Sequence, residues 1–229
     1  MPHPAEHATV GVLFSGGLDS AILVGRLAAS GRKVVPLFIR SGLVWQDEEL
    51  RAARRFLDAL GTPVKDDLVV LEVPLDDLYA NHWSRTGDDV PDAASPDEAV
   101  YLPGRNALLI IKAAVWCQLH GIGELALGVL GTSPFDDARS VFFEHLEAAL
   151  NAAPASSLRL TRPLGEMDKK QVIQLGRELP LRHTFSCLSP VGSMHCGACN
   201  KCAERREAFR AAGLDDPTPY AAASAAVER

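Results

Sequence analysis

The sequence lacks the segments that would direct a chain to a membrane or a secretory route. No run approaches the roughly eighteen apolar residues of a membrane-spanning helix. The N-terminus, MPHPAEHATVGVLF, has no basic segment followed by an apolar one, as a signal peptide would. Basic residues are also outnumbered, since 23 Lys and Arg face 29 Asp and Glu. A net charge of -6 argues against a broad nucleic-acid face, so we expect a cytoplasmic protein with a small-molecule substrate and no stable nucleic-acid binding.

Two common nucleotide-binding motifs are missing as well. No Gly-Lys-Ser/Thr follows a glycine-rich loop at the Walker spacing, and no Gly-x-Gly-x-x-Gly fingerprint is present. The sequence also shows no internal repeat and no low-complexity tract. Any phosphate-binding loop in this chain must therefore be of another kind.

What is present is an alternation of apolar, β-branched runs with helical patterns. With 229 residues, of which 47% are hydrophobic, the chain can bury one core without disulfides. This alternation predicts an α/β fold, a doubly wound parallel sheet of about five strands with helices on both faces. The predicted strands are 9–14, 33–39, 68–73, 124–130 and 157–162, and the predicted helices are 18–29, 46–60, 104–120, 140–151 and 168–178.

The C-terminal part changes character. We expect residues 1–180 to form the catalytic domain and residues 181–229 to form a metal-binding segment packed on it, with a helix at 199–212 and a mobile Ala-rich tail. Between residues 79 and 103 lies a long stretch with three prolines and little periodicity. Connections of that length are usually functional lids or disordered segments.

The strongest local signal is Ser15-Gly16-Gly17-Leu18-Asp19-Ser20, directly after the first predicted strand. Two glycines allow a tight turn, so backbone N–H groups and the start of the next helix can face one anion. The serines add hydroxyl donors, and Asp19 could hold a Mg2+ ion that bridges phosphates. An ordinary glycine-rich turn between strand and helix is the alternative.

A second signal is four cysteines, Cys187, Cys196, Cys199 and Cys202, in the spacing C-x8-C-x2-C-x2-C. Four thiolates can close a tetrahedral zinc shell that leaves no position for water, so we expect a structural Zn2+. The alternatives are a redox Cys-x-x-Cys pair, a site in which His183 or His195 replaces one cysteine, and an iron–sulfur cluster. The fifth cysteine, Cys117, is expected to be a packed core thiol.

These motifs carry a resemblance. The Ser15 to Ser20 turn resembles the pyrophosphate loop (PP-loop) of the N-type ATP pyrophosphatases, whose fold is similar to that of the adenine nucleotide alpha hydrolases. Together with the cysteines, the chain resembles the 7-cyano-7-deazaguanine synthase family from about residue 8 to residue 220. The further matching segments are Tyr101 to Asn106, Asp137-Ala138-Arg139, Lys169 and Glu204 to Phe209.

The resemblance implies an ATP-dependent carbon–nitrogen ligase of queuosine biosynthesis. It would convert 7-carboxy-7-deazaguanine and ammonia to 7-cyano-7-deazaguanine through adenylated intermediates and release AMP and pyrophosphate. ATP and Mg2+ would bind at Ser15, Gly16, Gly17, Leu18, Asp19 and Ser20. The implied catalytic residues are Asp19, Arg105, Asp137, Arg139 and Lys169. Without the resemblance, the last four are ordinary surface charges, with Asp137 and Arg139 forming a local ion pair.

One segment departs from the family pattern. After the second predicted strand the family has Asp-Tyr-Gly-Gln and a histidine, whereas this chain has Ile39 to Trp45. We therefore expect substrate specificity to depend on this loop. The open alternatives are a related enzyme that couples the acyl-adenylate to another amine, including a protein amine, a tRNA-modifying PP-loop enzyme, and a non-catalytic zinc-ribbon module. A homodimer also remains open.

Overall fold

The sheet is parallel and has five strands, as the alternation of patterns predicts. The computed structural model describes residues 9–61, 64, 68–152 and 157–221. The strands are β1 (Val10–Leu13), β2 (Val34–Arg40), β3 (Val69–Glu72), β4 (Glu124–Leu127) and β5 (Arg159–Thr161), in the order β3-β2-β1-β4-β5. All four pairings are parallel, for example Val10 with Val34 and Gly11 with Leu125. Every helix in these residues is too short or too polar to span a bilayer.

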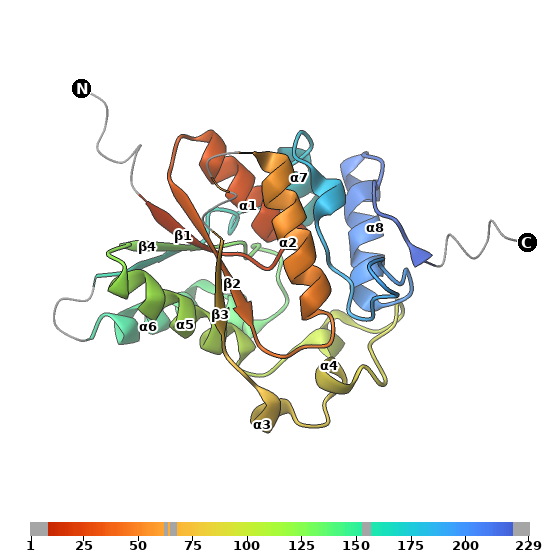
Figure 1. Cartoon of the computed structure of the whole chain (residues 1–229), viewed down its shortest axis with the longest axis horizontal. Coiled ribbons are helices and arrows are strands. Elements are labelled where there is room, and N and C mark those ends of the chain that lie inside the picture. Colours follow the sequence, from red (N-terminus) through yellow and green to blue (C-terminus); the bar gives the residue numbers. More distant parts are fainter. Residues whose placement is uncertain (1–8, 62–63, 65–67, 153–156, 222–229) are drawn as a thin grey trace, which may run out of the picture.

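Helices cover both faces of the sheet (Figure 1). The longer helices are α1 (Leu18–Ala29), α2 (Gln46–Leu60), α5 (Arg105–Leu119), α6 (Ser140–Leu150), α7 (Lys169–Leu175) and α8 (Asn200–Ala212). The core on one face joins α1, α2, α7 and α8 to the sheet, and the core on the other face joins α5 and α6 to it. The predicted boundaries of α1 and α2 are confirmed, and those of the other long helices differ by one to three residues.

The direction in which successive strands are added across the sheet changes after β3. From β1 the chain builds outward through β2 and β3, and it then returns to place β4 on the other side of β1. Because the connections after β1 and β4 leave in opposite directions, a crevice opens at the carboxyl ends of these two strands. The turn after β1 therefore lies at the usual ligand position of such sheets.

The long stretch from residue 79 to residue 103 is ordered. It contains the short helix α4 (Trp83–Thr86) and the 3-10 helix η2 (Asp97–Val100), and it follows the short helix α3 (Asp76–Tyr79). Arg85 bonds to the carbonyl of Gly42 and pairs with Asp76, which ties this segment to the loop after β2. The remaining 3-10 helices are η3 (Asp136–Ala138) and η4 (Leu181–His183).

The segment after α7 is held together by one buried arginine. Arg205 is 1% exposed and donates to the hydroxyls of Thr218 at 2.6 Å and Thr184 at 2.9 Å. It also reaches the carbonyl of Leu181 and the hydroxyl of Ser186, both at 3.2 Å. One guanidinium thus connects α8 with η4 and with the C-terminal segment around Thr218. The expected mobile tail, residues 222–229, lies outside the described residues.

Candidate active site and metal centre

The turn after β1 is built to hold an anion. Gly16 has a φ of +79°, and a Cβ at this position would lie 2.8 Å from the carbonyl oxygen of Glu49, so only glycine fits. The hydroxyl of Ser20 lies 3.2 Å from that of Ser15 and also bonds to the backbone of Ser15 and Gly17. Gly17 precedes α1 without a side-chain cap, so the first N–H groups of this helix remain for a ligand.

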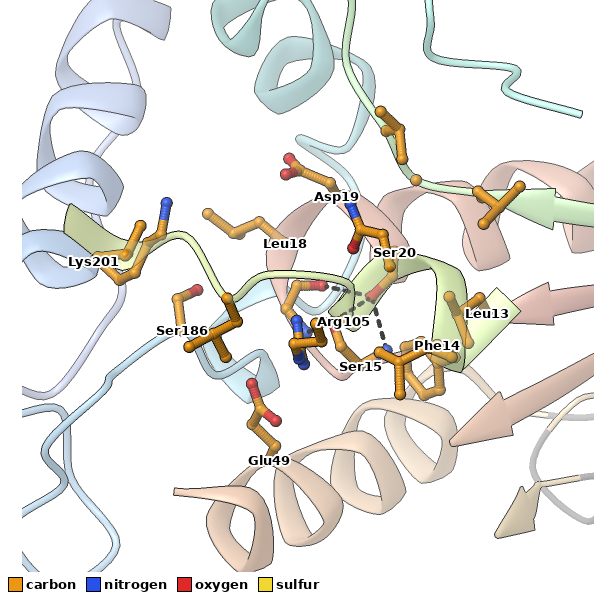
Figure 2. Close-up of a pocket in the computed structure, with 18 of the residues that line it drawn as sticks. Leu13, Phe14, Ser15, Leu18, Asp19, Ser20, Glu49, Arg105, Ser186 and Lys201 are labelled. Carbon is orange, nitrogen blue, oxygen red and sulfur yellow. Dashed lines mark hydrogen bonds between the residues drawn. The ribbon is translucent and has the colours of Figure 1, made fainter. Parts of the chain in front are cut away.

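A cavity of about 380 Å3 opens above this turn. Residues Ser15, Gly17, Leu18, Asp19 and Ser20 line it, and so do residues from α2, α4, α5, η3, α7 and α8 (Figure 2). Its wall also includes Gly128, which follows β4. A Cβ on Gly128 would lie 3.0 Å from the backbone nitrogen of Ser20, so the chain after β4 approaches the first turn of α1 as closely as glycine allows.

Four charged side chains form a network on one side of the cavity. The amino group of Lys169 lies 2.8 and 3.0 Å from the carboxylate oxygens of Asp19 and 3.0 Å from Glu204. Lys201 reaches the other oxygen of Glu204 at 2.6 Å. Burial alone would lower the pKa of Lys169, but the carboxylates of Asp19 and Glu204 outweigh it and raise that pKa. Burial would likewise raise the pKa of Glu204, yet the two lysines lower it to about 2. Lys169 and Glu204 are therefore both charged at neutral pH.

The start of α5 places two further predicted residues in the same cavity. Arg105 and Asp137 both line it, and the Arg105 Nε and one Asp137 carboxylate oxygen are buried with no partner in the described residues. Burial raises the pKa of Asp137 despite a hydrogen bond from Asn106. Two side chains of opposite charge that line one cavity and keep unpartnered buried polar atoms favour a polar ligand near them.

Another part of the wall is aromatic. The rings of Trp45 and Trp83 are stacked, with centroids 5.6 Å apart and an interplanar angle of 20°, and both line the cavity with Phe185. Glu49, one helical turn after Trp45, also lines it, and its carboxylate extends into the cavity (Figure 2). Desolvation raises the pKa of Glu49 to about 7, against the opposing effects of Arg105 and a hydrogen bond with Trp45.

The cysteine cluster lies beside this aromatic wall. The sulfur atoms of Cys187, Cys196, Cys199 and Cys202 all lie within 4.8 Å of one another, with 3.9 Å between Cys187 and Cys199 and between Cys196 and Cys202. A tetrahedral thiolate shell with bonds of about 2.3 Å requires sulfurs about 3.8 Å apart. The four residues therefore fit a metal ion.

Backbone N–H groups support the thiolate form of these cysteines. Leu188 donates to the sulfur of Cys199 at 3.4 Å, and Cys196 donates to the sulfur of Cys187 at 3.2 Å. His195 does not join the cluster, because its Nε2 accepts a hydrogen bond from the Ser186 N–H at 3.1 Å. Elsewhere in the described residues, no second group of three or more potential ligand side chains is assembled for a metal. Cys117 is fully buried, as expected, and burial raises its pKa to about 12.

The structure separates the predicted catalytic residues into two sets. Asp19, Arg105, Asp137 and Lys169 meet at one cavity, although residues 19 and 169 are 150 positions apart. Arg139 does not line the cavity. Its side chain is 68% exposed and pairs with Asp136 at 2.9 Å, not with Asp137, so a catalytic role for Arg139 remains a prediction without geometric support.

Three cavity residues were missed from the sequence. Lys201 and Glu204 are separated by three positions at the start of α8, a spacing typical of a surface pair, and Glu49 looks like one more acid in the first turn of α2. Arg40, in the loop that departs from the family pattern, does not line the cavity and pairs with Asp47 at 2.6 Å. Trp45, at the end of that loop, does line it.

Comparisons with known proteins agree with this geometry. Residues 9–213 match the family model described as QueC, queuosine biosynthesis protein QueC. A 7-cyano-7-deazaguanine synthase of Methanothrix thermoacetophila is 31% identical over 223 residues, which cover 91% of this chain and 96% of that protein. The synthase of Syntrophobacter fumaroxidans is 32% identical over 229 residues, with 91% and 94% covered.

A solved structure supports the fold alone. The U34-tRNA thiolase NcsA of Methanococcus maripaludis superimposes with a TM-score of 0.51 at 13% identity, covering 90% of this chain and 68% of that one. At that identity the likeness confirms the arrangement of strands and helices and carries no information on substrate.

Proposed function

Because the chain belongs to the QueC family of queuosine biosynthesis proteins, we propose that it is an ATP-dependent ligase that makes 7-cyano-7-deazaguanine from 7-carboxy-7-deazaguanine and ammonia. The observation that carries the proposal is a single cavity lined both by the glycine-rich turn after β1 and by stacked aromatic side chains. Such a cavity can hold a nucleotide phosphate and a flat heterocycle next to each other.

The proposed reaction uses two molecules of ATP. The substrate carboxylate attacks the α-phosphorus, pyrophosphate leaves, and the nitrogen of ammonia then displaces AMP to give an amide. The amide oxygen attacks the α-phosphorus of a second ATP and expels a second pyrophosphate. The amide nitrogen then loses its two protons and the oxygen leaves with AMP, so that a nitrile remains. These steps need positioning and charge stabilisation more than covalent help from the protein.

The described side chains divide this work. We assign the departing pyrophosphate to the turn at Ser15–Ser20 and to the N–H groups of α1. Lys169, held in place by Asp19 and Glu204, is suited to neutralise a phosphate oxygen. Arg105 adds a positive charge from the start of α5, where its side chain lines the cavity.

Magnesium is part of the proposal because the network is close to neutral. Two lysines and two carboxylates cannot balance a triphosphate, so we expect the nucleotide to bring Mg2+. Asp19 would be its protein ligand, although both oxygens of this carboxylate now contact Lys169. The ion would bridge phosphate oxygens and draw charge from them.

We propose Zn2+ for the cysteine cluster, in a structural role. The sulfur separations suit its tetrahedral shell, and four thiolates leave no open position for water. We also retain the division into a catalytic domain at residues 1–180 and a metal-binding segment at residues 181–229. A cytoplasmic location is included because the reaction draws on ATP and ammonia.

Two of the alternative functions can be separated by the same experiment. Purified protein would be incubated with ATP, Mg2+, ammonium and 7-carboxy-7-deazaguanine, and the products identified by mass spectrometry. We expect nitrile with two AMP per product and pyrophosphate, whereas ADP as the main nucleotide would overturn the proposal. Amide or a protein adduct without nitrile would instead indicate transfer to another amine. A tRNA-thiolating enzyme would need a reactive thiol, and no cysteine occurs among the described residues that line the cavity.

A further inference from the structure

One carboxylate in the cavity, that of Glu49, has a hydrogen bond with Trp45 but no ion pair among the described residues. Asp19 and Glu204 each contact a lysine, and Asp137 takes a hydrogen bond from Asn106. Glu49 forms no ion pair with any described lysine, arginine or histidine within 4.0 Å, although it lines the same cavity. In Figure 2 its carboxylate points into the cavity, towards Arg105 and Ser186.

Glu49 is also held in a fixed position relative to the PP-loop. Its carbonyl oxygen lies against Gly16, at 2.8 Å from the position of a Cβ there, so the first turns of α2 pack directly on the PP-loop. The carbonyl of Gly16 accepts the N–H of Phe185 at 2.8 Å, which brings an aromatic side chain to the same corner. Trp45, four residues earlier on α2, completes the corner and is stacked on Trp83.

We infer that Glu49 selects the heterocycle, accepting two N–H donors from the ring edge that carries the exocyclic amine of a guanine-type base. This inference rests on the proposed function and names the residue that determines its substrate class. The N–H at position 1 and the amine at position 2 of such a ring point in nearly the same direction. A carboxylate accepts such a donor pair with two parallel hydrogen bonds.

The surroundings of Glu49 make it selective. A ring without the exocyclic amine would leave part of a desolvated carboxylate unpartnered, and an unpartnered buried acceptor is heavily penalised. The aromatic rings beside it offer stacking area to any flat base and cannot distinguish one donor pattern from another. Discrimination among purine-like rings therefore depends on the carboxylate.

The burial of Glu49 gives a second, independent signature. Because its pKa is raised to about 7, a sizeable share of the free protein carries a proton on this carboxyl at neutral pH. Two ligand donors favour the charged form, so binding of a guanine-type ring would release this proton. A residue with a merely structural role would show no such release.

The test pairs two substrates with three proteins. The substrates are 7-carboxy-7-deazaguanine and its analogue that lacks the 2-amino group, and the proteins are wild type, Glu49→Gln and the control Asp47→Asn. Asp47 lies in the same first turn of α2, is 63% exposed and does not line the cavity, so its substitution removes the same charge from the same helix end. Thermal melts of all three proteins establish that each is folded.

We expect wild type and Asp47→Asn to prefer the amino-bearing substrate on the order of a hundredfold in kcat/KM. In Glu49→Gln this preference should fall below about tenfold, mainly because KM for the amino-bearing substrate rises. Calorimetry near neutral pH in buffers of different ionisation enthalpy should show proton release with wild type and none with Glu49→Gln.

The possible failures are distinct. If wild type turns over 7-carboxy-7-deazaguanine and Glu49→Gln retains the full preference, this inference is wrong while the proposed function stands. A loss of kcat on both substrates with unchanged binding would make Glu49 a proton acceptor in the reaction and would also overturn it. If wild type neither binds nor converts the amino-bearing substrate, the proposed function fails and takes this inference with it.

Discussion

Replacing Glu49 with glutamine is expected to stabilise the protein above neutral pH and to change its stability little near pH 4.5. Desolvation raises the pKa of this carboxyl from 4.5 to about 7, with Arg105 and Trp45 acting in the opposite direction. The folded chain therefore binds the proton more tightly than the unfolded chain. Stability that depends on the neutral carboxyl is lost as the pH rises from 4.5 through 7.

The size of this effect follows from the pKa. A rise of this extent is equivalent to about 3 kcal/mol if fully expressed, and the partial exposure of Glu49 in the cavity reduces it to about 1 to 2 kcal/mol. Glutamine keeps the shape of the side chain and removes the charge. In a domain of this size, 1 kcal/mol shifts Tm by about 2 to 4 °C, so the variant should melt about 2 to 8 °C higher near pH 8.

The assay is urea unfolding of wild type, Glu49→Gln and Asp47→Asn at about pH 4.5 and about pH 8. The exposed Asp47 should show no comparable gain at the higher pH. If the difference in unfolding free energy between Glu49→Gln and wild type is the same at both pH values, burial does not raise the pKa of the Glu49 carboxyl and the reasoning fails. A gain in stability together with a loss of substrate preference would mark a residue kept for function at the expense of stability.

Further predictions concern the other parts of the site. Asp19→Asn should lower kcat/KM on the order of a hundredfold with little change in Tm, because the residue orients Lys169 at the phosphate; a wild-type rate would remove it from the site. Elemental analysis should find about one zinc ion per chain in wild type and less in Cys187→Ser, and iron in place of zinc in wild type would refute the metal assignment. Arg205→Met should destabilise by about 3 to 5 kcal/mol, because it leaves the acceptors around a fully buried guanidinium without a donor, and an unchanged urea midpoint would contradict this. Trp45→Ala should raise KM for the heterocycle about ten- to a hundredfold with ATP binding unchanged, and equal effects on both ligands would speak against a stacking role.

The fold could be predicted closely because its signals are local. The period of apolar residues along 18–29 and 46–60 depends only on neighbours within one helix, and both helices occur within those limits. The turn at Ser15–Ser20 and the four cysteines likewise consist of consecutive or nearby residues, so their chemistry can be inferred from residue type and spacing.

Boundaries were less predictable where several elements compete for a segment. The strand predicted at 124–130 ends at Leu127, because Gly128 must pass within contact distance of α1 and the chain turns there toward the cavity. The stretch from 79 to 103 showed no period, yet it is ordered by contacts with distant residues. Among these are the hydrogen bonds from the Ala93 N–H to Ala198 and from the Asn200 N–H to Pro91.

The sequence by itself determined which residues can bind an anion, which can bind a metal, and that the chain would form a parallel sheet. Only the tertiary structure decided which charges meet. It brought Lys169 to Asp19 across 150 positions, added Glu204 and Lys201 from α8, turned Arg139 toward solvent, and left Glu49 facing the cavity without an ion-pair partner in the described residues. The physical reason is that the periodicity of a helix or strand determines which of its side chains share one face. Which faces of different elements come into contact depends on strand order and on the packing of every element between them.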